Sequence, residues 1–404
     1  MAQVRPFAAL RPQPMLANKI CELPYDVMSS AEAREMARGN PLSFLHVSKP
    51  EIDLPENIDP YDARVYAKGR ENFTRLLAEG ALQKDPQPCF YFYRQIMGLH
   101  RQTGLVASAS CQEYLEGLIK KHEFTRPDKE DDRARHIETL QAQTGPVFLV
   151  YRATEKMDEL AAAVLAQPPD TDFVAADGIR HTAWTVREAG AIEAIGAAFT
   201  AIPFLYIADG HHRCAAAARV YQTRKGAGES AHFLSVIFPH NQLQILPYNR
   251  VVKAAPGLDG AQLLKKLEGV FQFLPGGAAV PAARHEVSLY LEGRWHGLRF
   301  RREWTEGRTA LEGLDVFLLQ ERVLGPIFGI DNPRTSQAVH FVGGIRGTAG
   351  LESLVNSKEY ACAFSIYPTR IEDLMEIADA GGVMPPKSTW FEPKLRDAMF
   401  CHLI

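Results

Sequence analysis

The first half of the chain alternates between amphipathic stretches and short apolar runs. Residues 60–80 and 131–144 carry apolar side chains at helical spacing, so both stretches predict helices. The aromatic run 88–98 predicts a strand, and residues 98–114 predict its hairpin partner and the turn beyond. The apolar run 146–152 predicts a further strand.

The second half shows the same mixture of elements. Residues 286–300 alternate between apolar and polar side chains around a central Glu-Gly pair, which is typical of a β-hairpin. Residues 314–328 and 371–382 predict helices, and residues 360–368 predict a strand. Strands and helices are interspersed without a strict β-α-β rhythm. The predicted fold class is therefore α+β, or mixed α/β.

One stretch rich in Gly, Pro and Ala marks the best candidate for a domain boundary. It spans residues 256–284 and contains a single short helical pattern. We therefore predict a first region over residues 1–255 and a second α/β region over residues 256–404. The candidate chemistry described below assigns phosphate or nucleotide binding and catalysis to the first region.

The stretch FLYIADGHHRCAAAARVY, residues 204–221, is the most distinctive in the chain. Residues 204–208 form an apolar run of strand type, Gly210 allows a tight turn, and the alanines that follow favour a helix. Asp209 occupies the position expected of a helix N-cap. A strand that enters a helix in this way leaves backbone N–H groups and the positive end of the helix dipole open, which suits a phosphate.

The residues after this turn are His211, His212 and Arg213. In the first turn of the helix they would add hydrogen-bond donors for phosphate oxygens. The alternative is that Asp209 only caps the helix and that the histidines serve packing. We favour the functional interpretation because two imidazoles and a guanidinium lower helix propensity without forming an amphipathic stripe. A zinc site that includes Cys214 is disfavoured, because adjacent histidines point to different faces and no further ligand set is visible.

Residues 118–138 form a second polar constellation in which both signs of charge are interleaved. A solvated charged surface would explain such a run. The same residue types could also supply a carboxylate base, cations for phosphate and acidic ligands for Mg²⁺, which are the parts that phosphoryl transfer needs. On residue types alone the two interpretations are equal. The polar members are Lys120, Lys121, His122, Glu123, Thr125, Arg126, Lys129, Asp131, Asp132, Arg133 and His136.

The C-terminal stretch GGVMPPKSTWFEPKL carries a third polar group of residues. Lys387 and Ser388 resemble the end of a phosphate loop, but prolines stand where that loop needs glycines. A lysine and a hydroxyl between prolines can still form a rigid anion contact. The glycine-rich turn in residues 329–347 lacks the spacing of a dinucleotide-binding motif.

Composition excludes several classes of protein. The formal net charge of -3 disfavours non-specific electrostatic binding to nucleic acid. The six cysteines form no C-x-x-C pair, which is typical of reduced thiols rather than of a disulfide framework. The N-terminal residues lack a signal-peptide core, and no segment reaches the ~20 apolar residues of a membrane span. We expect a cytoplasmic protein that binds no membrane.

Seven motifs together closely resemble those of a widespread bacterial family, the domain of unknown function numbered ten-fifteen. The resemblance extends over essentially the whole chain. The motifs are PYDV (24–27), NPLSFLHV (40–47), KKHEFTRPDKEDDRARH (120–136), ADGHHR (208–213), ILPYNRVV (245–252), HFVGG (340–344) and MPPKSTWFEPKL (384–395).

Two of these motifs, the His-Glu pair and DGHHR, are also similar to those of free serine kinases of the ParB/sulfiredoxin fold. Those kinases phosphorylate L-serine from a nucleotide or pyrophosphate donor. The resemblance implies a ParB/sulfiredoxin-like phosphate-binding core in which Glu123 takes the serine hydroxyl proton beside His122. Asp209 would assist the hydroxyl or hold Mg²⁺. The resemblance also implies that DGHHR, with Gly210, His211, His212 and Arg213, holds the phosphates. Apart from the resemblance, we expect Arg126, Lys129 and Arg133 to bind donor phosphates or the acceptor carboxylate. We expect Lys387 and Ser388 to close the site from the C-terminal part.

The expected function is that of a phosphotransferase acting on a small hydroxylated metabolite. Free L-serine is the first candidate acceptor, with Mg²⁺ as cofactor and a nucleotide or pyrophosphate as phosphoryl donor. One alternative is a nucleotide-binding regulator of the ParB type without catalysis, although nucleic acid is not an expected partner. The other is a phosphatase, or a kinase for a different small metabolite.

Overall fold

The computed structural model describes residues 2–255 and 257–404, and the chain forms two compact units. Unit 1 comprises Met1–Leu243 together with Pro393–Ile404, and unit 2 comprises Gln244–Glu392. Unit 2 is thus inserted into the sequence of unit 1. The strand at residues 248–252 belongs to the sheet of unit 2, so this division differs from the predicted one after residue 255. Residue 256, at which the sequence predicts the second region to begin, lies outside the described residues.

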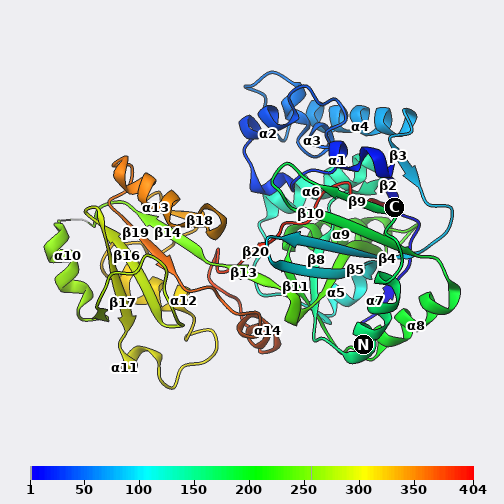
Figure 1. Ribbon diagram of the computed structural model, residues 1–404. Coiled ribbons are helices and arrows are strands. Elements are labelled where there is room, and N and C mark those ends of the chain that lie inside the picture. The colour runs from blue at the N-terminus through cyan, green and yellow to red at the C-terminus, as the bar shows by residue number, and fades with distance from the viewer. Residues whose placement is uncertain (1, 256) are drawn as a thin grey trace. The chain divides into compact units, whose positions relative to one another are not determined.

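Unit 1 is built on a large mixed sheet (Figure 1). Most neighbouring strands are antiparallel, but β11 pairs with β6 and β12 pairs with β8 in parallel. The order across the sheet is β6 (Ile119–Lys120), β11 (Leu205–Asp209), β8 (Val147–Tyr151), β12 (His232–Pro239), β5 (His100–Ser110), β4 (Phe90–Met97), β10 (Arg180–Val186) and β9 (Thr171–Val174), and β1 (Val4–Arg5) pairs with β5. The predicted strands at 88–98 and 146–152 are confirmed as β4 and β8, and the hairpin partner is confirmed as β5.

The helices of unit 1 flank this sheet and extend beyond it. In Figure 1, α2, α3 and α4 lie together at one end of the unit, away from α7 and α8. The α-helices are α1 (Ala17–Ile20), α2 (Ser30–Ala37), α3 (Leu45–Ser48), α4 (Ala63–Ala78), α5 (Cys111–Leu115), α6 (Pro127–Leu140), α7 (Glu155–Leu165), α8 (Ala189–Thr200) and α9 (His211–Arg224). The short 3₁₀ turns are η1 (Pro14–Leu16), η2 (Tyr25–Val27), η3 (Pro50–Asp53) and η4 (His240–Gln242). Two further strand pairs are β2 (Leu10–Pro12) with β3 (Leu82–Lys84), and β7 (Ala142–Gln143) with β21 (His402–Leu403).

Local sequence explains where the predicted helices of unit 1 begin and end. The helix expected at 131–144 is α6, which starts four residues earlier because Pro127 occupies a first-turn position that needs no N–H donor. It ends before Gln141, whose φ of 56° is left-handed. The helix expected at 60–80 is confirmed as α4, and the Asp62 side chain caps it by accepting a hydrogen bond from the Arg64 amide.

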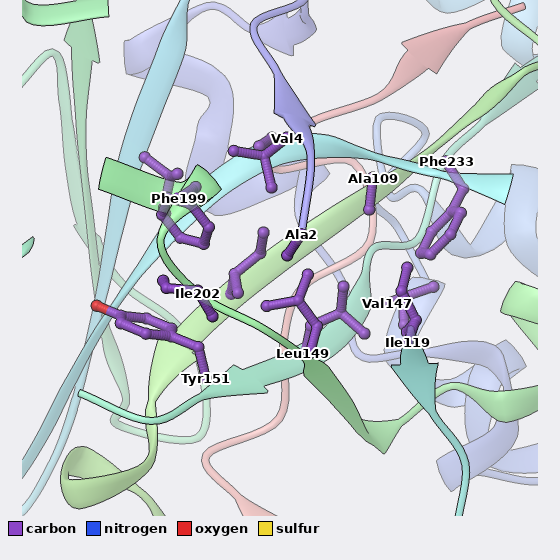
Figure 2. Close-up of a cluster of buried hydrophobic side chains, with 14 of the residues drawn as sticks. Ala2, Val4, Ala109, Ile119, Val147, Leu149, Tyr151, Phe199, Ile202 and Phe233 are labelled. Atoms are coloured by element: carbon purple, nitrogen blue, oxygen red, sulfur yellow. The ribbon is translucent and has the colours of Figure 1, made fainter. Parts of the chain in front are cut away.

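One hydrophobic cluster connects the sheet of unit 1 to its helices (Figure 2). Side chains two residues apart on β8, such as Val147 and Leu149, enter this cluster because alternate residues of a strand share a face. Phe199 of α8 and Phe233 of β12 pack into the same cluster and are almost fully buried. Burial of each such side chain contributes about 1.5–3 kcal/mol, so this core fixes the strand ends that carry the polar residues described below.

Unit 2 contains an antiparallel sheet of its own. The order across it is β15 (Phe271–Leu274), β17 (Arg294–Phe300), β16 (Glu286–Leu291), β19 (Cys362–Ile366), β14 (Tyr248–Val252) and β18 (Val339–Gly343), and β13 (Gln244–Leu246) pairs separately with β20 (Trp390–Glu392). The helical segments are α10 (Gly260–Leu267), α11 (Arg302–Thr305), α12 (Asp315–Leu319), η5 (Gln320–Leu324), η6 (Gly344–Arg346), α13 (Gly347–Asn356) and α14 (Ile371–Asp379). The hairpin predicted at 286–300 is confirmed as β16 and β17. Both units mix strands with helices, which confirms the predicted class.

Candidate functional site

The candidate site lies where β11 passes into α9. Gly210 connects them with a φ of +94°, a left-handed conformation that favours glycine. A Cβ atom at Gly210 would lie 3.5 Å from the Cα atom of Val147 in β8, so the turn also packs closely. His211, His212 and Arg213 form the first turn of α9, as the sequence predicts.

Asp209 does not cap α9, and this prediction is wrong. The carboxylate belongs to the last residue of β11, and Gly210 takes the N-cap position without any side-chain capping bond. Lys394 instead donates from Nζ to Oδ2 of Asp209 at 2.8 Å. Burial would raise the pKa of Asp209, but Lys394 and Arg213 hold it well below its usual range. Asp209 is therefore an ionised carboxylate that pairs with Lys394 and is not the N-cap of α9.

The His-Glu pair that follows β6 meets the first turn of α9. Oε2 of Glu123 lies 3.9 Å from Nδ1 of His211. The rings of His122 and His211 are perpendicular, with centroids 4.5 Å apart. The amide N–H of Arg126 donates to Nε2 of His212 at 3.1 Å. The two polar motifs of the sequence therefore form one cluster within unit 1.

Burial keeps His122 and His211 neutral. It lowers the pKa of His122 to about 4, although Asp209 nearby opposes the change. It also lowers the pKa of His211 well below its usual range, and His122 adds to the effect. Among the described residues, Nδ1 of His122 and Nε2 of His211 are buried nitrogens without a hydrogen-bond partner. Buried polar atoms are normally paired, so these two nitrogens indicate a position for a ligand or for water.

Arg213 is surrounded by acidic groups. Its guanidinium lies 3.5 Å from Oδ1 of Asp26 and donates to the carbonyl of Pro146. Burial would lower the pKa of Arg213, but Asp26, Asp397 and Asp209 raise it. Arg213 is therefore a fixed cation whose charge is balanced by the protein itself.

A small cavity of about 40 Å³ connects Arg213 to Arg133. Both arginines line it together with Tyr25 and Asp397. The Arg133 guanidinium stacks on the Tyr25 ring, with Cζ 3.8 Å from the centroid, and pairs with Asp132 at 2.7 Å. Since a cavity needs about 10–15 Å³ of such volume to hold a water molecule, this one has room for a few waters.

The remaining predicted cations have other contacts. Arg126 pairs with Asp128 at 2.8 Å on an exposed surface, and Lys129 donates to the Tyr61 hydroxyl at 2.7 Å. Lys387 and Ser388 belong to unit 2, where the Ser388 hydroxyl donates to the Pro385 carbonyl at 2.6 Å. Their assignment to phosphate binding stays a prediction.

The sequence interpretation missed three residues of the site. Asp26 lies in η2, and Lys394 and Asp397 lie in the C-terminal segment of unit 1. The sequence contained one indication of two of them: Asp26 lies in the motif PYDV and Lys394 in the motif MPPKSTWFEPKL. Neither motif assigned a role to these residues. The Gln95 side chain donates to the Lys394 carbonyl at 2.7 Å and so fixes this segment against β4.

The described residues show no ready-made metal site. In residues 2–255 and 257–404, no three His, Cys, Asp or Glu side chains are grouped as metal ligands. Oδ2 of Asp209 is bound by Lys394, which does not fit its predicted use as a ligand for Mg²⁺. No step proposed below depends on Mg²⁺. Within the same residues, no helix has the length and apolar character that crossing a membrane requires.

A comparison with models of protein families gives a match over most of the chain. A family model described as "Protein of unknown function (DUF1015)" matches residues 4–317. No curated protein matches by sequence.

Several solved structures resemble the fold at low TM-scores. A free serine kinase in complex with AMP has a TM-score of 0.35 and 14% identity, and the match covers 71% of this chain and 86% of that chain. SbnI with C-terminal truncation from Staphylococcus aureus has a TM-score of 0.39 and 11% identity, with 72% and 85% covered. A conserved hypothetical protein from Pyrococcus furiosus has a TM-score of 0.35 and 15% identity, with 72% and 93% covered. At these TM-scores the similarities assign no role to any residue of this chain.

Proposed function

Since this chain belongs to the DUF1015 family, whose description assigns no activity, we propose from the site itself that the protein is a phosphotransferase acting on a small hydroxylated metabolite. The observation that carries the proposal is the position of Glu123. Its carboxylate lies 3.9 Å from Nδ1 of His211 in the first turn of α9. The proposed base and the helix end proposed to bind phosphate therefore lie side by side.

The N-terminus of α9 supplies the phosphate side of the proposed reaction. The N-cap residue Gly210 has no side chain with which to cap the first turn, and the helix dipole places partial positive charge there. The unpartnered nitrogens of His122 and His211 add two hydrogen-bonding atoms. Each neutral imidazole carries one N–H donor and one acceptor nitrogen, and its tautomer decides which of the two a ligand meets.

Glu123 supplies the acceptor side of the proposed reaction. About 37% of its side chain is exposed, so an acceptor hydroxyl can reach it from solvent. In the proposed step the hydroxyl proton passes to the Glu123 carboxylate while the hydroxyl oxygen bonds to phosphorus. The bond between phosphorus and the donor's bridging oxygen breaks, and the donor leaves with that electron pair.

Asp209 and Lys394 have a positioning role in this proposal. Their 2.8 Å ion pair attaches the end of β11 to the C-terminal segment, directly before the turn at Gly210. The pair therefore fixes the direction in which the first N–H groups of α9 point. Arg213, whose charge is balanced by Asp26 and Asp397, supports the same turn through its hydrogen bond to the Pro146 carbonyl.

The finer assignments are L-serine as acceptor and a nucleotide or pyrophosphate as donor. They are supported by the similarity of the His-Glu and DGHHR motifs to those of free serine kinases. Arg126 and Lys129 are proposed to approach the donor phosphates or the acceptor carboxylate. Mg²⁺ bound with the donor would neutralise phosphate charge.

The test is ³¹P NMR of the purified protein with Mg²⁺ and L-serine, offering ATP, ADP and pyrophosphate in separate samples. The Glu123→Gln variant removes the base with little change in shape. Glu138→Gln, an exposed glutamate of α6 outside the site, is the matched control. A general base contributes about 10²–10⁴-fold to a rate. We therefore expect the O-phosphoserine signal to fall by at least ~100-fold in Glu123→Gln alone, with donor affinity nearly unchanged.

Each other outcome selects a different function. Release of inorganic phosphate without phosphoserine would indicate a phosphatase, and product from a different hydroxylated acceptor would indicate another kinase. Tight donor binding with no product from any acceptor would favour the nucleotide-binding regulator. Equal loss of turnover and of donor affinity in Glu123→Gln would show that this residue holds the site together rather than acting as a base.

A further inference from the structure

A second cavity in unit 1 lies away from the candidate site. It has a volume of about 330 Å³, which is at the small end of the range for pockets that hold small organic ligands. Its walls come from β4, β5, α7 and η4, and apolar atoms form most of them, including those of Phe92 and Leu165. Tyr151, at the end of β8, also lines it. Val147 at the other end of β8 lies beside Gly210, so the two sites are separated by the length of that strand.

Two arginines line this apolar cavity without acidic partners. Arg94 of β4 is half-buried, Arg101 of β5 is exposed, and the charge of Arg101 acts on Arg94. Burial lowers the pKa of Arg94, and the like charge of Arg101 lowers it further. Asp158 of α7 also lines the cavity, but among the described residues neither arginine forms an ion pair with it or with any other acid. A half-buried cation such as Arg94 is unfavourable without a counter-charge, and a bound anion would supply that charge.

Surrounding contacts hold the Arg94 side chain in one place. Its Nε donates to Oγ1 of Thr103 at 3.1 Å, and its guanidinium stacks on the Trp184 ring at 5.0 Å. The Thr103 amide donates to Oε1 of Gln242 at 2.9 Å. These contacts use Nε of Arg94 and the acceptor oxygen of Gln242. The terminal nitrogens of both side chains are left, within the described residues, as donors without a hydrogen-bond partner.

We propose that this cavity binds a small organic carboxylate with an apolar body, which would be a ligand site separate from the one proposed for phosphoryl transfer. The carboxylate lies against Arg94 and Arg101, and the apolar body packs on Phe92 and Leu165. An anchored guanidinium presents parallel N–H donors that match the two oxygens of a carboxylate. The apolar walls select against inorganic anions, which gain nothing from them.

The test uses 4-phenylbutyrate as the probe. Trp184 is a natural reporter, because it stacks on Arg94 and is the only one of the four tryptophans of the chain that lies in unit 1. In protein labelled with 5-fluorotryptophan, ¹⁹F NMR follows its signal during titration. The comparison compounds are the neutral amide of the same acid, the corresponding amine and inorganic phosphate. Arg94→Gln removes the anchored charge, and Arg180→Gln on the neighbouring strand β10 is the matched control outside the cavity.

We expect the carboxylate to shift the Trp184 signal saturably and the other three compounds to bind at least ~10-fold more weakly, as expected for a lost charged hydrogen bond. Arg94→Gln should weaken carboxylate binding by a similar factor, and Arg180→Gln should leave it unchanged. Equal binding of the acid and its amide would overturn the proposal, and so would saturation by phosphate alone or no response to the acid. The comparison of acid with amide needs only the unmutated protein, so it decides the matter even if Arg94→Gln fails to fold.

Discussion

Replacing Asp397 by Asn is expected to stabilise unit 1 at alkaline pH and to have little effect at acidic pH. Asp397 is buried, and its Oδ1 atom has no hydrogen-bond partner among the described residues. Burial raises the pKa of Asp397 to about 7; Arg213 opposes the change, and Asp26 adds to it. At neutral and alkaline pH the folded protein therefore holds a carboxylate where the surroundings favour the neutral acid.

The magnitude follows from the difference between the folded and unfolded pKa values. An unfolded aspartate has a pKa of ~3.9, so between about pH 4 and pH 7 the folded state keeps a proton that the unfolded chain has lost. The stability of unit 1 falls as the pH rises through this window, by about 1.4 kcal/mol for each pH unit. Above pH 7 the total loss amounts to about 4 kcal/mol, as an upper value. Asn carries no charge at any pH and avoids this loss.

The assay is urea unfolding at about pH 5 and about pH 8, followed by the ¹⁹F signal of Trp184 so that only unit 1 is observed. The difference in free energy of unfolding between the Asn variant and the unmodified protein should be larger at pH 8 than at pH 5. The increase should be at most about 4 kcal/mol. A gain that is the same at both pH values, or a variant less stable at pH 8, would refute the assignment of a buried carboxylate with a raised pKa.

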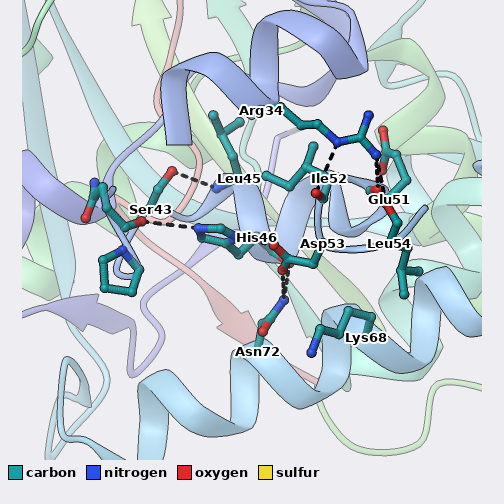
Figure 3. Close-up of polar contacts among 12 residues, drawn as sticks. Arg34, Ser43, Leu45, His46, Glu51, Ile52, Asp53, Leu54, Lys68 and Asn72 are labelled. Carbon is teal, nitrogen blue, oxygen red and sulfur yellow. Dashed lines mark hydrogen bonds and ion pairs between the residues drawn. The ribbon is translucent and has the colours of Figure 1, made fainter. Parts of the chain in front are cut away.

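Two further predictions concern unit 1. Gly210→Ala should destabilise it by about 1–2 kcal/mol, because alanine is strained at a φ of +94°. The control is Gly190→Ala in helix α8, where no atom lies within 4 Å of the added Cβ. This control should be neutral or slightly stabilising in the same urea assay. The ion pair of Nδ1 of His46 with Oδ1 of Asp53, at 2.8 Å (Figure 3), raises the pKa of His46. The pKa of Asp53 is lowered even though burial would raise it. The pair therefore contributes fully between about pH 4 and pH 6.5, and its contribution falls as rising pH passes the folded pKa of His46 or as falling pH passes that of Asp53. Asp53→Asn should cost about 1 kcal/mol within this window and less at pH 8.5, so an equal cost at both pH values would contradict this account.

Periodicity and turn residues were sufficient to predict many of the secondary-structure elements. The hairpin at 286–300, the helix at 60–80 and the strand before Gly210 depend on local preferences, which the sequence carries directly. The position of the His-His-Arg group in a first helical turn was predictable for the same reason. Helix starts were less predictable, as Pro127 shows, because an N-terminal proline can extend a helix through residues that carry no apolar pattern.

The carboxylates and the lysine of the site depend on tertiary structure and were not predictable from local pattern. Asp209 precedes a helix, as an N-cap would, yet its partner Lys394 comes from the far end of the chain. Asp26 and Asp397 act on Arg213 from segments without helical or strand periodicity. Only the tertiary fold brings these charged side chains together. The residue types in the sequence could therefore indicate phosphate chemistry, but not which acidic groups balance the cations of the site.

The insertion of unit 2 has a consequence for the order in which the protein can fold during synthesis. Residues 393–404 contribute Lys394 to Asp209 and the strand β21 to β7, and the Phe400 ring packs against Tyr91 and Tyr93. The ribosome makes this segment only after the whole of unit 2. A nascent chain that already contains β11 and α9 therefore has an unpaired Asp209 and an incomplete core until unit 2 has been translated. Unit 2 can complete its own sheet during that interval, so the candidate site is among the last parts of the molecule to form.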